Sequence, residues 1–175
     1  MVLSFPEVRT FVAEELAKAI KEQFPSADRI AGIATAGIAH GALAAHIMNA
    51  PYCYVRPEPK KHGLKNQVEG ELNPGDNVVL VEDLISTGKS SFQAVEAVQA
   101  AGAHVIGVVA LFTYGFANAT EKFADANIPV FTLTNLPTLT QVAAENGFIQ
   151  PSQLQTINNF AQNPQEWGRY HQNIG

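Results

Sequence analysis

The sequence has only one cysteine, and it lacks both a signal-peptide pattern and an apolar run long enough to cross a membrane. Cys53 is its single cysteine, which excludes a disulfide framework within one chain and favours a reducing compartment. The residues after Met1 contain no basic segment ahead of an apolar core, so no signal peptide is indicated. The longest strongly apolar run, residues 105–112, is too short to span a bilayer. We therefore expect a soluble, cytoplasmic protein without a membrane partner.

Charged residues are also few. They make up 15% of the 175 residues, and 16 Asp and Glu against 11 Lys and Arg give a formal net charge of −5. An acidic chain has no general attraction for the phosphates of nucleic acid, so nucleic acid is not an expected partner. Hydrophobic residues make up 46%, enough for a sizeable core, and no repeat or low-complexity segment is present. We expect residues 1–175 to form a single domain.

Short apolar segments alternate with helical patterns along the chain. Apolar, often β-branched runs bounded by turn residues predict five strands, at residues 29–33, 52–55, 78–81, 104–111 and 128–133. Helical spacing separates them, and this alternation is typical of an α/β fold with a mostly parallel sheet between helices, in three layers. Right-handed crossovers would place the polar loops that follow these strands at one edge of the sheet.

Residues 78–91 are the strongest candidate for a functional site. Four apolar residues run into Glu82 and Asp83, a short loop rich in hydroxyl groups follows, and a helical pattern begins. On a regular strand, two adjacent carboxylates point to opposite faces. Amides and hydroxyls at a helix N-terminus suit a phosphate, whereas carboxylates suit sugar hydroxyls or a metal ion. Asp83 could instead only cap the turn, but capping does not require the hydroxyls of Ser86, Thr87 and Ser90.

Residues 88–90, Gly-Lys-Ser, resemble the end of a Walker A phosphate-binding loop. That motif requires a glycine five positions before Gly88, where this chain has Asp83. A carboxylate at that position would repel the enclosed phosphates. The sequence therefore argues against an ATPase or GTPase of this class.

The segment 56–70 is a second candidate, because it lacks hydrophobic periodicity and is predicted to be a long exposed loop. Its basic residues are Arg56, Lys60, Lys61, His62 and Lys65. Such a cluster is usually only a solvated surface. The alternative is a loop that closes over an anionic substrate, stabilises a leaving group and uses His62 as a general acid. The histidines within helix or strand patterns are interpreted as structural: His40, His46 and His104. No spacing predicts a structural zinc site.

These segments together resemble the type I phosphoribosyltransferases, in particular the orotate branch of that family. Residues 81–90, Val-Glu-Asp-Leu-Ile-Ser-Thr-Gly-Lys-Ser, are similar to the family's signature for phosphoribosyl diphosphate (PRPP). Residues 56–70 are similar to the mobile catalytic loop of the orotate branch, and their Lys60-Lys61-His62-Gly63 is the more specific marker. Residues 34–38 resemble the diphosphate-binding loop, and residues 112–116 resemble a segment of one bacterial branch. The similarity extends over nearly the whole chain.

The resemblance implies the type I phosphoribosyltransferase fold and a pentosyltransferase that depends on Mg²⁺. The implied reaction transfers phosphoribosyl from PRPP to orotate and gives orotidine 5′-phosphate and diphosphate, a step of de novo pyrimidine (UMP) biosynthesis. The implied partners are PRPP, orotate and a second copy of the chain in a homodimer. Mg²⁺ would be bound mainly through the oxygens of PRPP and not directly by the protein.

The resemblance also implies roles for the matched residues. The expected catalytic residues are Lys60, His62 and Asp83. The expected PRPP-binding residues are Arg56, Lys60, His62, Glu82, Asp83, Leu84, Ile85, Ser86, Thr87, Gly88, Lys89 and Ser90. Within this set, the two acids hold the ribose hydroxyls, residues 84–90 enclose the 5′-phosphate, and the three residues of the basic loop contact the diphosphate from the neighbouring subunit. Thr35, Ala36 and Gly37 belong to the diphosphate loop, and Ser86 lies near the orotate.

The chain departs from the family pattern in two respects. Pro57 stands where many members carry a second lysine, which removes one cation and stiffens the loop. No Ser-Gly-x-Lys-Ser-Pro-like motif occurs, so we expect the N-terminal hood that covers the base to be missing. Because that hood sets base choice, two alternatives stay open: a phosphoribosyltransferase for another base, and a non-catalytic PRPP-binding regulatory protein. Lys60 and His62 favour the enzyme, since a sensor needs no leaving-group chemistry.

Overall fold

The computed structural model describes residues 2–58, 67–164 and 167. The strands are β1 (Arg29–Ile33), β2 (Tyr52–Val55), β3 (Val68–Glu69), β4 (Asn77–Ile85), β5 (His104–Thr113) and β6 (Val130–Asn135). The helices are α1 (Pro6–Gln23), α2 (Ala36–Met48), α3 (Lys89–Ala100), α4 (Ala117–Asp125), α5 (Leu136–Glu145) and α6 (Pro151–Gln162), preceded by the 3₁₀ turn η1 (Val2–Ser4). None of the helices in the described part of the chain is long and apolar enough to cross a membrane.

Among the described residues, six strands form one sheet in the order β3-β2-β1-β4-β5-β6. β3 is antiparallel to β2, and all the other pairs are parallel. The predicted α/β class with a mostly parallel sheet is confirmed, with one strand more than the five predicted. The additional strand, β3, lies within the segment 56–70 that is predicted to be loop. Its two residues are too few to carry a hydrophobic pattern, so only pairing with β2 defines it.

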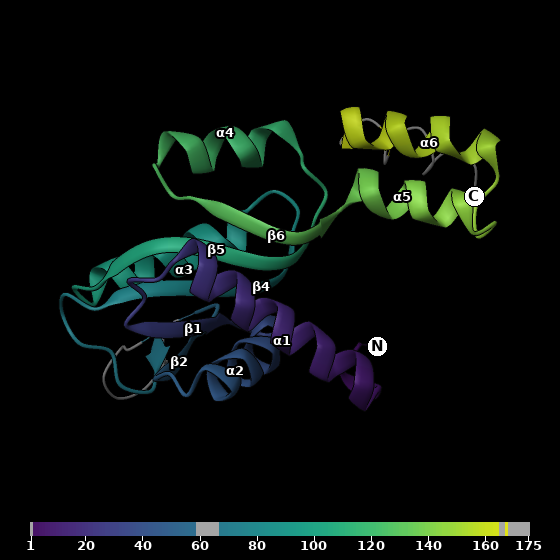
Figure 1. Cartoon of the computed structure of the whole chain (residues 1–175). Coiled ribbons are helices and arrows are strands. Elements are labelled where there is room, and N and C mark those ends of the chain that lie inside the picture. Colours follow the sequence, from purple (N-terminus) through teal and green to yellow (C-terminus); the bar gives the residue numbers. More distant parts are fainter. Residues whose placement is uncertain (1, 59–66, 165–166, 168–175) are drawn as a thin grey trace.

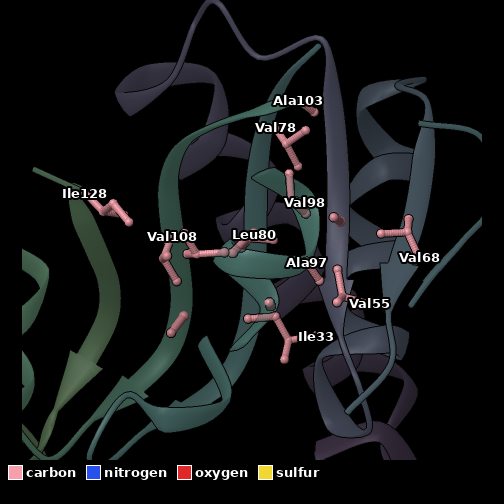
Figure 2. Close-up of a cluster of buried hydrophobic side chains, with 14 of the residues drawn as sticks. Ile33, Val55, Val68, Val78, Leu80, Ala97, Val98, Ala103, Val108 and Ile128 are labelled. Atoms are coloured by element: carbon pink, nitrogen blue, oxygen red, sulfur yellow. The ribbon is translucent and has the colours of Figure 1, made fainter. Parts of the chain in front are cut away.

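Helices cover both faces of the sheet, which confirms the three predicted layers (Figure 1). Alternate residues of β4 divide between two cores, because successive side chains of a strand point to opposite faces. Val79 and Val81 pack with residues of α1 and α2. On the other face, Val78 and Leu80 pack with residues of α3 and α4, and Figure 2 shows them beside Val98 of α3. The paired helices α5 and α6 lie beyond the end of β6 (Figure 1).

β4 is longer than the predicted strand 78–81, because it continues through both carboxylates to Ile85. Its parallel ladder with β5 pairs Glu82 with Ala110 and Ile85 with Thr113. β5 is long enough to supply backbone hydrogen-bond partners to the polar end of β4 as well as to its apolar part. The hydrophobic pattern of β4 alone does not indicate where such pairing ends. The two carboxylates therefore lie inside a strand, and Asp83 does not precede a turn as a capping residue would.

Candidate functional site at the C-terminal edge of the sheet

Three segments that follow strands meet at the edge formed by the C-terminal ends of β1, β2 and β4. The N–H of Ala34 donates to the carbonyl of Val55 over 2.9 Å. Ala34, Arg56 and Ser90 also line one small recess between these segments. The start of the predicted diphosphate loop, the start of the predicted basic loop and the first turn of α3 are thus neighbours. Open α/β sheets bind their ligands at this edge.

Glycine at position 37 allows the diphosphate loop to approach β4. A methyl group added there would collide with the carbonyl oxygen of Val81 and lie 3.3 Å from the Cα of Glu82. Gly37 is also in the first turn of α2, whose N-terminal amide groups lie at the same edge. Close contact between α2 and β4 therefore places Thr35, Ala36 and Gly37 next to the acidic pair.

Glu82 is buried on the α3 side of β4, with 4% of its surface exposed. The Ser90 hydroxyl donates to its Oε2 over 3.1 Å, and the Asp83 N–H donates to its Oε1 over 3.2 Å. Burial, and secondly hydrogen bonding with the Asp83 side chain, raises the pKa of Glu82 to about 8. A carboxyl that keeps its proton at neutral pH reduces the negative charge that the pair presents to an anionic ligand.

Asp83 lies on the opposite face of β4, as the alternation of a regular strand predicts. It lines a cleft of about 580 Å³ together with Ala36, His40 and Leu84. The far walls come from η1, α1, β5 and β6 and are mainly apolar, with Phe11, Leu111, Phe112 and Leu133 among them. The pair thus presents one carboxyl to the first turn of α3 and the other to this cleft.

His40 belongs to this cleft, although the sequence interpretation treats it as structural. It is 6% exposed, and burial lowers its pKa while the charge of Asp83 opposes that shift. One feature of the sequence could have indicated this role for His40. It stands four residues after Ala36, which places it on the same face of α2 as the diphosphate loop. That spacing predicts the shared face, but only the packing of α2 on β4 shows that the face meets Asp83.

The predicted phosphate-binding residues form a short loop, residues 86–89, that we call the phosphate loop. No N–H of Ser86, Thr87 or Gly88 donates a hydrogen bond to another residue in the described ranges. Lys89 begins α3, whose first amides lack intrahelical acceptors. Free amides at a helix N-terminus, with hydroxyls beside them, are the donors that a phosphate requires.

Leu84 and Ile85 differ from the other residues predicted to enclose the phosphate, because both are in β4. The Ile85 carbonyl accepts from the Tyr114 N–H over 3.1 Å and from the Thr113 hydroxyl over 3.3 Å, and the Ile85 side chain is buried. Leu84 lines the cleft next to Asp83 and is partly exposed. Leu84 and Ile85 thus form the end of the strand that precedes the phosphate loop, and their role in enclosing the phosphate stays a prediction.

Arg56 begins the basic segment immediately after β2. Its backbone N–H donates to the Gln67 carbonyl over 2.9 Å, and the Gln67 side chain donates to the Arg56 carbonyl over 2.8 Å. Its guanidinium forms an ion pair with Glu69 at 3.5 Å. These contacts close the base of the segment against β3. Lys60 and His62 lie outside the described residues, so their roles stay predictions.

The described residues contain no group of three His, Cys, Asp or Glu side chains that could hold a metal ion. A hard cation such as Mg²⁺ takes six or more oxygen ligands, so oxygens of a bound ligand or water would have to complete its shell. The half-buried carboxyl of Asp83, which lines the cleft, would be a protein oxygen donor available to such a shell.

The sequence matches the family described as phosphoribosyl transferase domain over residues 7–145. An orotate phosphoribosyltransferase of Bacillus subtilis is 52% identical over 165 residues, which cover 94% of this chain and 76% of that protein. A protein of the same name from Streptococcus agalactiae is 47% identical over 167 residues, which cover 95% and 80% of the two chains. Identity at this level, over nearly the whole chain, indicates membership of the same family and not only a shared fold.

Solved structures show the same relationship at lower identity. Leishmania donovani UMP synthase superposes with a TM-score of 0.78 at 27% identity over 91% of this chain, which corresponds to 34% of that larger protein. Orotate phosphoribosyltransferase from Aeropyrum pernix superposes with a TM-score of 0.73 at 27% identity, over 85% of this chain and 81% of that one. These matches confirm the resemblance drawn from the sequence. The chain belongs to the phosphoribosyltransferase family and, within it, to the orotate phosphoribosyltransferases.

Proposed function

We propose that this chain transfers the phosphoribosyl group of PRPP to orotate, giving orotidine 5′-phosphate and diphosphate for UMP synthesis. The observation that carries the proposal is the arrangement at the end of β4. There an acidic pair is followed by a loop with free amide and hydroxyl donors, beside the N-terminus of α2. The acidic pair can bind the hydroxyls of a sugar. The phosphate loop and the N-terminus of α2 can each bind a phosphate group on either side of that sugar. The names of the relatives supply the base, orotate.

Each part of this edge has a proposed role in the transfer. The phosphate loop binds the 5′-phosphate, Asp83 accepts hydrogen bonds from the ribose hydroxyls, and residues 35–37 hold the diphosphate. A pyrimidine nitrogen of orotate then forms a bond to the anomeric carbon and loses its own proton, which the departing diphosphate can accept. The bond from that carbon to the diphosphate oxygen breaks, and the diphosphate takes the electron pair. Positive charge from Lys60 and a proton from His62 would stabilise the leaving group.

The cleft beside Asp83 is the proposed position of the base. Leu84 and Phe112 give it an apolar wall, which suits the face of a flat pyrimidine ring, and Ser86 lies at the start of the phosphate loop nearby. Mg²⁺ is the proposed cofactor, and when bound it would neutralise charge on the diphosphate. The chain's own contribution to that shell would be small, because the described residues build no metal cage.

The activity is tested by incubating the purified chain with PRPP, Mg²⁺ and orotate and following the loss of orotate absorbance. Parallel reactions contain adenine, hypoxanthine or uracil in place of orotate, and one reaction contains EDTA. We expect turnover of orotate alone and no turnover with EDTA. Turnover of a purine without orotate would contradict the proposed substrate. Saturable PRPP binding without turnover of any base would instead support a regulatory PRPP-binding protein.

We also propose a cytoplasmic homodimer in which the basic loop reaches the neighbouring subunit's site. Lys60→Ala and Asp83→Asn would each inactivate the protein. In the proposed dimer, each site takes Asp83 from one subunit and Lys60 from the other. A mixed dimer of the two variants would contain one site with both native residues. Random reassortment should therefore restore about a quarter of the native activity. Light scattering that gives a monomer, or a mixture that stays inactive after verified reassortment, would contradict the proposed exchange of loops.

A further inference from the structure

The phosphate loop packs against two aromatic rings, Phe92 and Phe123, that are not among the predicted site residues. Gly88 has a φ of +74°, a backbone conformation that favours glycine. A Cβ added to Gly88 would lie 3.1 Å from Cε2 of Phe123 and 3.6 Å from Cδ2 of Phe92. The backbone of the loop is therefore in direct contact with side chains of α4 and α3, which leaves no space on that side of Gly88.

Neighbouring side chains hold the two rings in place. The ring centroids of Phe92 and Phe123 are 4.6 Å apart with a tilt of 32° between the planes. Phe123 is 4% exposed, and the Lys122 ammonium lies 4.2 Å from the centroid of the Phe92 ring. Tilted ring pairs and a cation over a ring are both favourable arrangements. α4 thus presents a fixed aromatic surface to the phosphate loop.

Hydrogen bonds constrain this loop much less than packing does. The free N–H groups of Ser86, Thr87 and Gly88 have no acceptor in the described part of the chain. The Gly88 carbonyl accepts from the Phe92 N–H over 2.9 Å, which ties the end of the loop to α3 but does not orient its amides. Packing of Phe123 and Phe92 against Gly88 is therefore the main constraint on the backbone that carries those amides.

We propose that Phe123 is a positioning residue for the phosphate loop, acting through the backbone of Gly88 on the amides that bind the 5′-phosphate. This inference rests on the proposed function and adds a residue of α4 to it. A smaller side chain at position 123 would allow the loop to relax, and the bound ligand would then have to order it, which weakens binding. The bond-breaking step occurs at the diphosphate side of the ribose, so kcat should change little.

The test compares Phe123→Leu with Phe24→Leu, a matched loss of a buried aromatic ring. Phe24 is 7% exposed and its ring packs over Gly107 of β5 in the core between the sheet and α1. We expect Phe123→Leu to raise the PRPP KM and the ribose 5-phosphate Kd by about tenfold, with kcat within about twofold. Phe24→Leu should lower the melting temperature without changing either binding constant. Phe123→Tyr keeps the ring and should retain near-native binding.

Two results would overturn the inference: an unchanged ribose 5-phosphate Kd in Phe123→Leu, or an equal rise of that Kd in both leucine variants. Calorimetry with ribose 5-phosphate examines the phosphate loop without requiring any base. A wild-type chain that binds ribose 5-phosphate but does not convert orotate would contradict the proposed function alone. A wild-type chain that does not bind it would overturn the role of Phe123 as well.

Discussion

Replacing Glu82 by glutamine should remove a large part of the pH dependence of folding stability. Glutamine has the size of glutamate, and the Ser90 hydroxyl can accept from its amide as well as donate to its oxygen. Glu82 is 4% exposed, and its pKa is raised from 4.5 to about 8 in the folded chain. The variant therefore changes the charge that position 82 can carry while preserving its packing.

The direction of the effect follows from where the proton is bound. Below pH 4.5 the Glu82 carboxyl is protonated in both the folded and the unfolded chain, so its burial has no ionisation cost. Above that pH the unfolded chain ionises while the folded chain keeps the proton, and stability is lost until pH passes about 8. At 1.36 kcal/mol for each pKa unit, wild type should lose about 4 kcal/mol relative to Glu82→Gln between pH 5 and pH 8.

Thermal unfolding from pH 5 to pH 9 measures this difference. A chain of this size shifts its melting temperature by about 2–4 °C for each kcal/mol, so the variant should exceed wild type by about 8–16 °C at pH 8 and by little at pH 5. Glu121→Gln on the exposed side of α4 is the matched control and should follow the wild-type curve. A difference between Glu82→Gln and wild type that stays constant across this range would refute the reasoning.

Three further substitutions examine other parts of the site. Lys60→Ala should lower kcat by about 10²-fold, much more than PRPP affinity, because its charge is needed mainly when diphosphate leaves; equal losses in steady-state kinetics would mean that the loop only binds. Gly37→Ala should cost about 1–3 kcal/mol of stability and reduce turnover, because its methyl group meets the Val81 carbonyl; an unchanged melting temperature would contradict that contact. Arg56→Ala should change stability in urea by less than about 1 kcal/mol, since the ion pair with Glu69 is partly exposed, and should raise the PRPP KM; an unchanged KM would exclude Arg56 from the site.

Most secondary-structure elements follow from local spacing in the sequence. β1 occupies residues 29–33 and β2 residues 52–55, as predicted from apolar runs bounded by turns. The continuous apolar run 78–81 correctly indicates a strand buried on both faces, because parallel sheets lie between two layers of helices. The acidic pair and the loop after it are recognisable because their residue types are adjacent in the chain. Family membership was also predictable, since the matching motifs are contiguous.

Contacts between distant segments were not predictable in this way. β4 extends to Ile85 because β5 supplies hydrogen-bond partners there, and the two residues of β3 form a strand only because they pair with β2. His40 faces the cleft of Asp83 because α2 packs closely on β4, and Phe123 supports Gly88 although 35 positions separate them in the sequence.

The sequence by itself therefore determined the position of most strands and helices, and which short motif carries phosphate and sugar chemistry. Apolar spacing encodes burial within one element, and a motif of neighbouring residues keeps its chemistry wherever it is placed. Only the tertiary structure decided that Glu82 is enclosed beside Ser90 with a raised pKa while Asp83 faces an open cleft. The physical reason is that desolvation and side-chain contacts depend on which elements pack together, and that packing is not a local property of the chain.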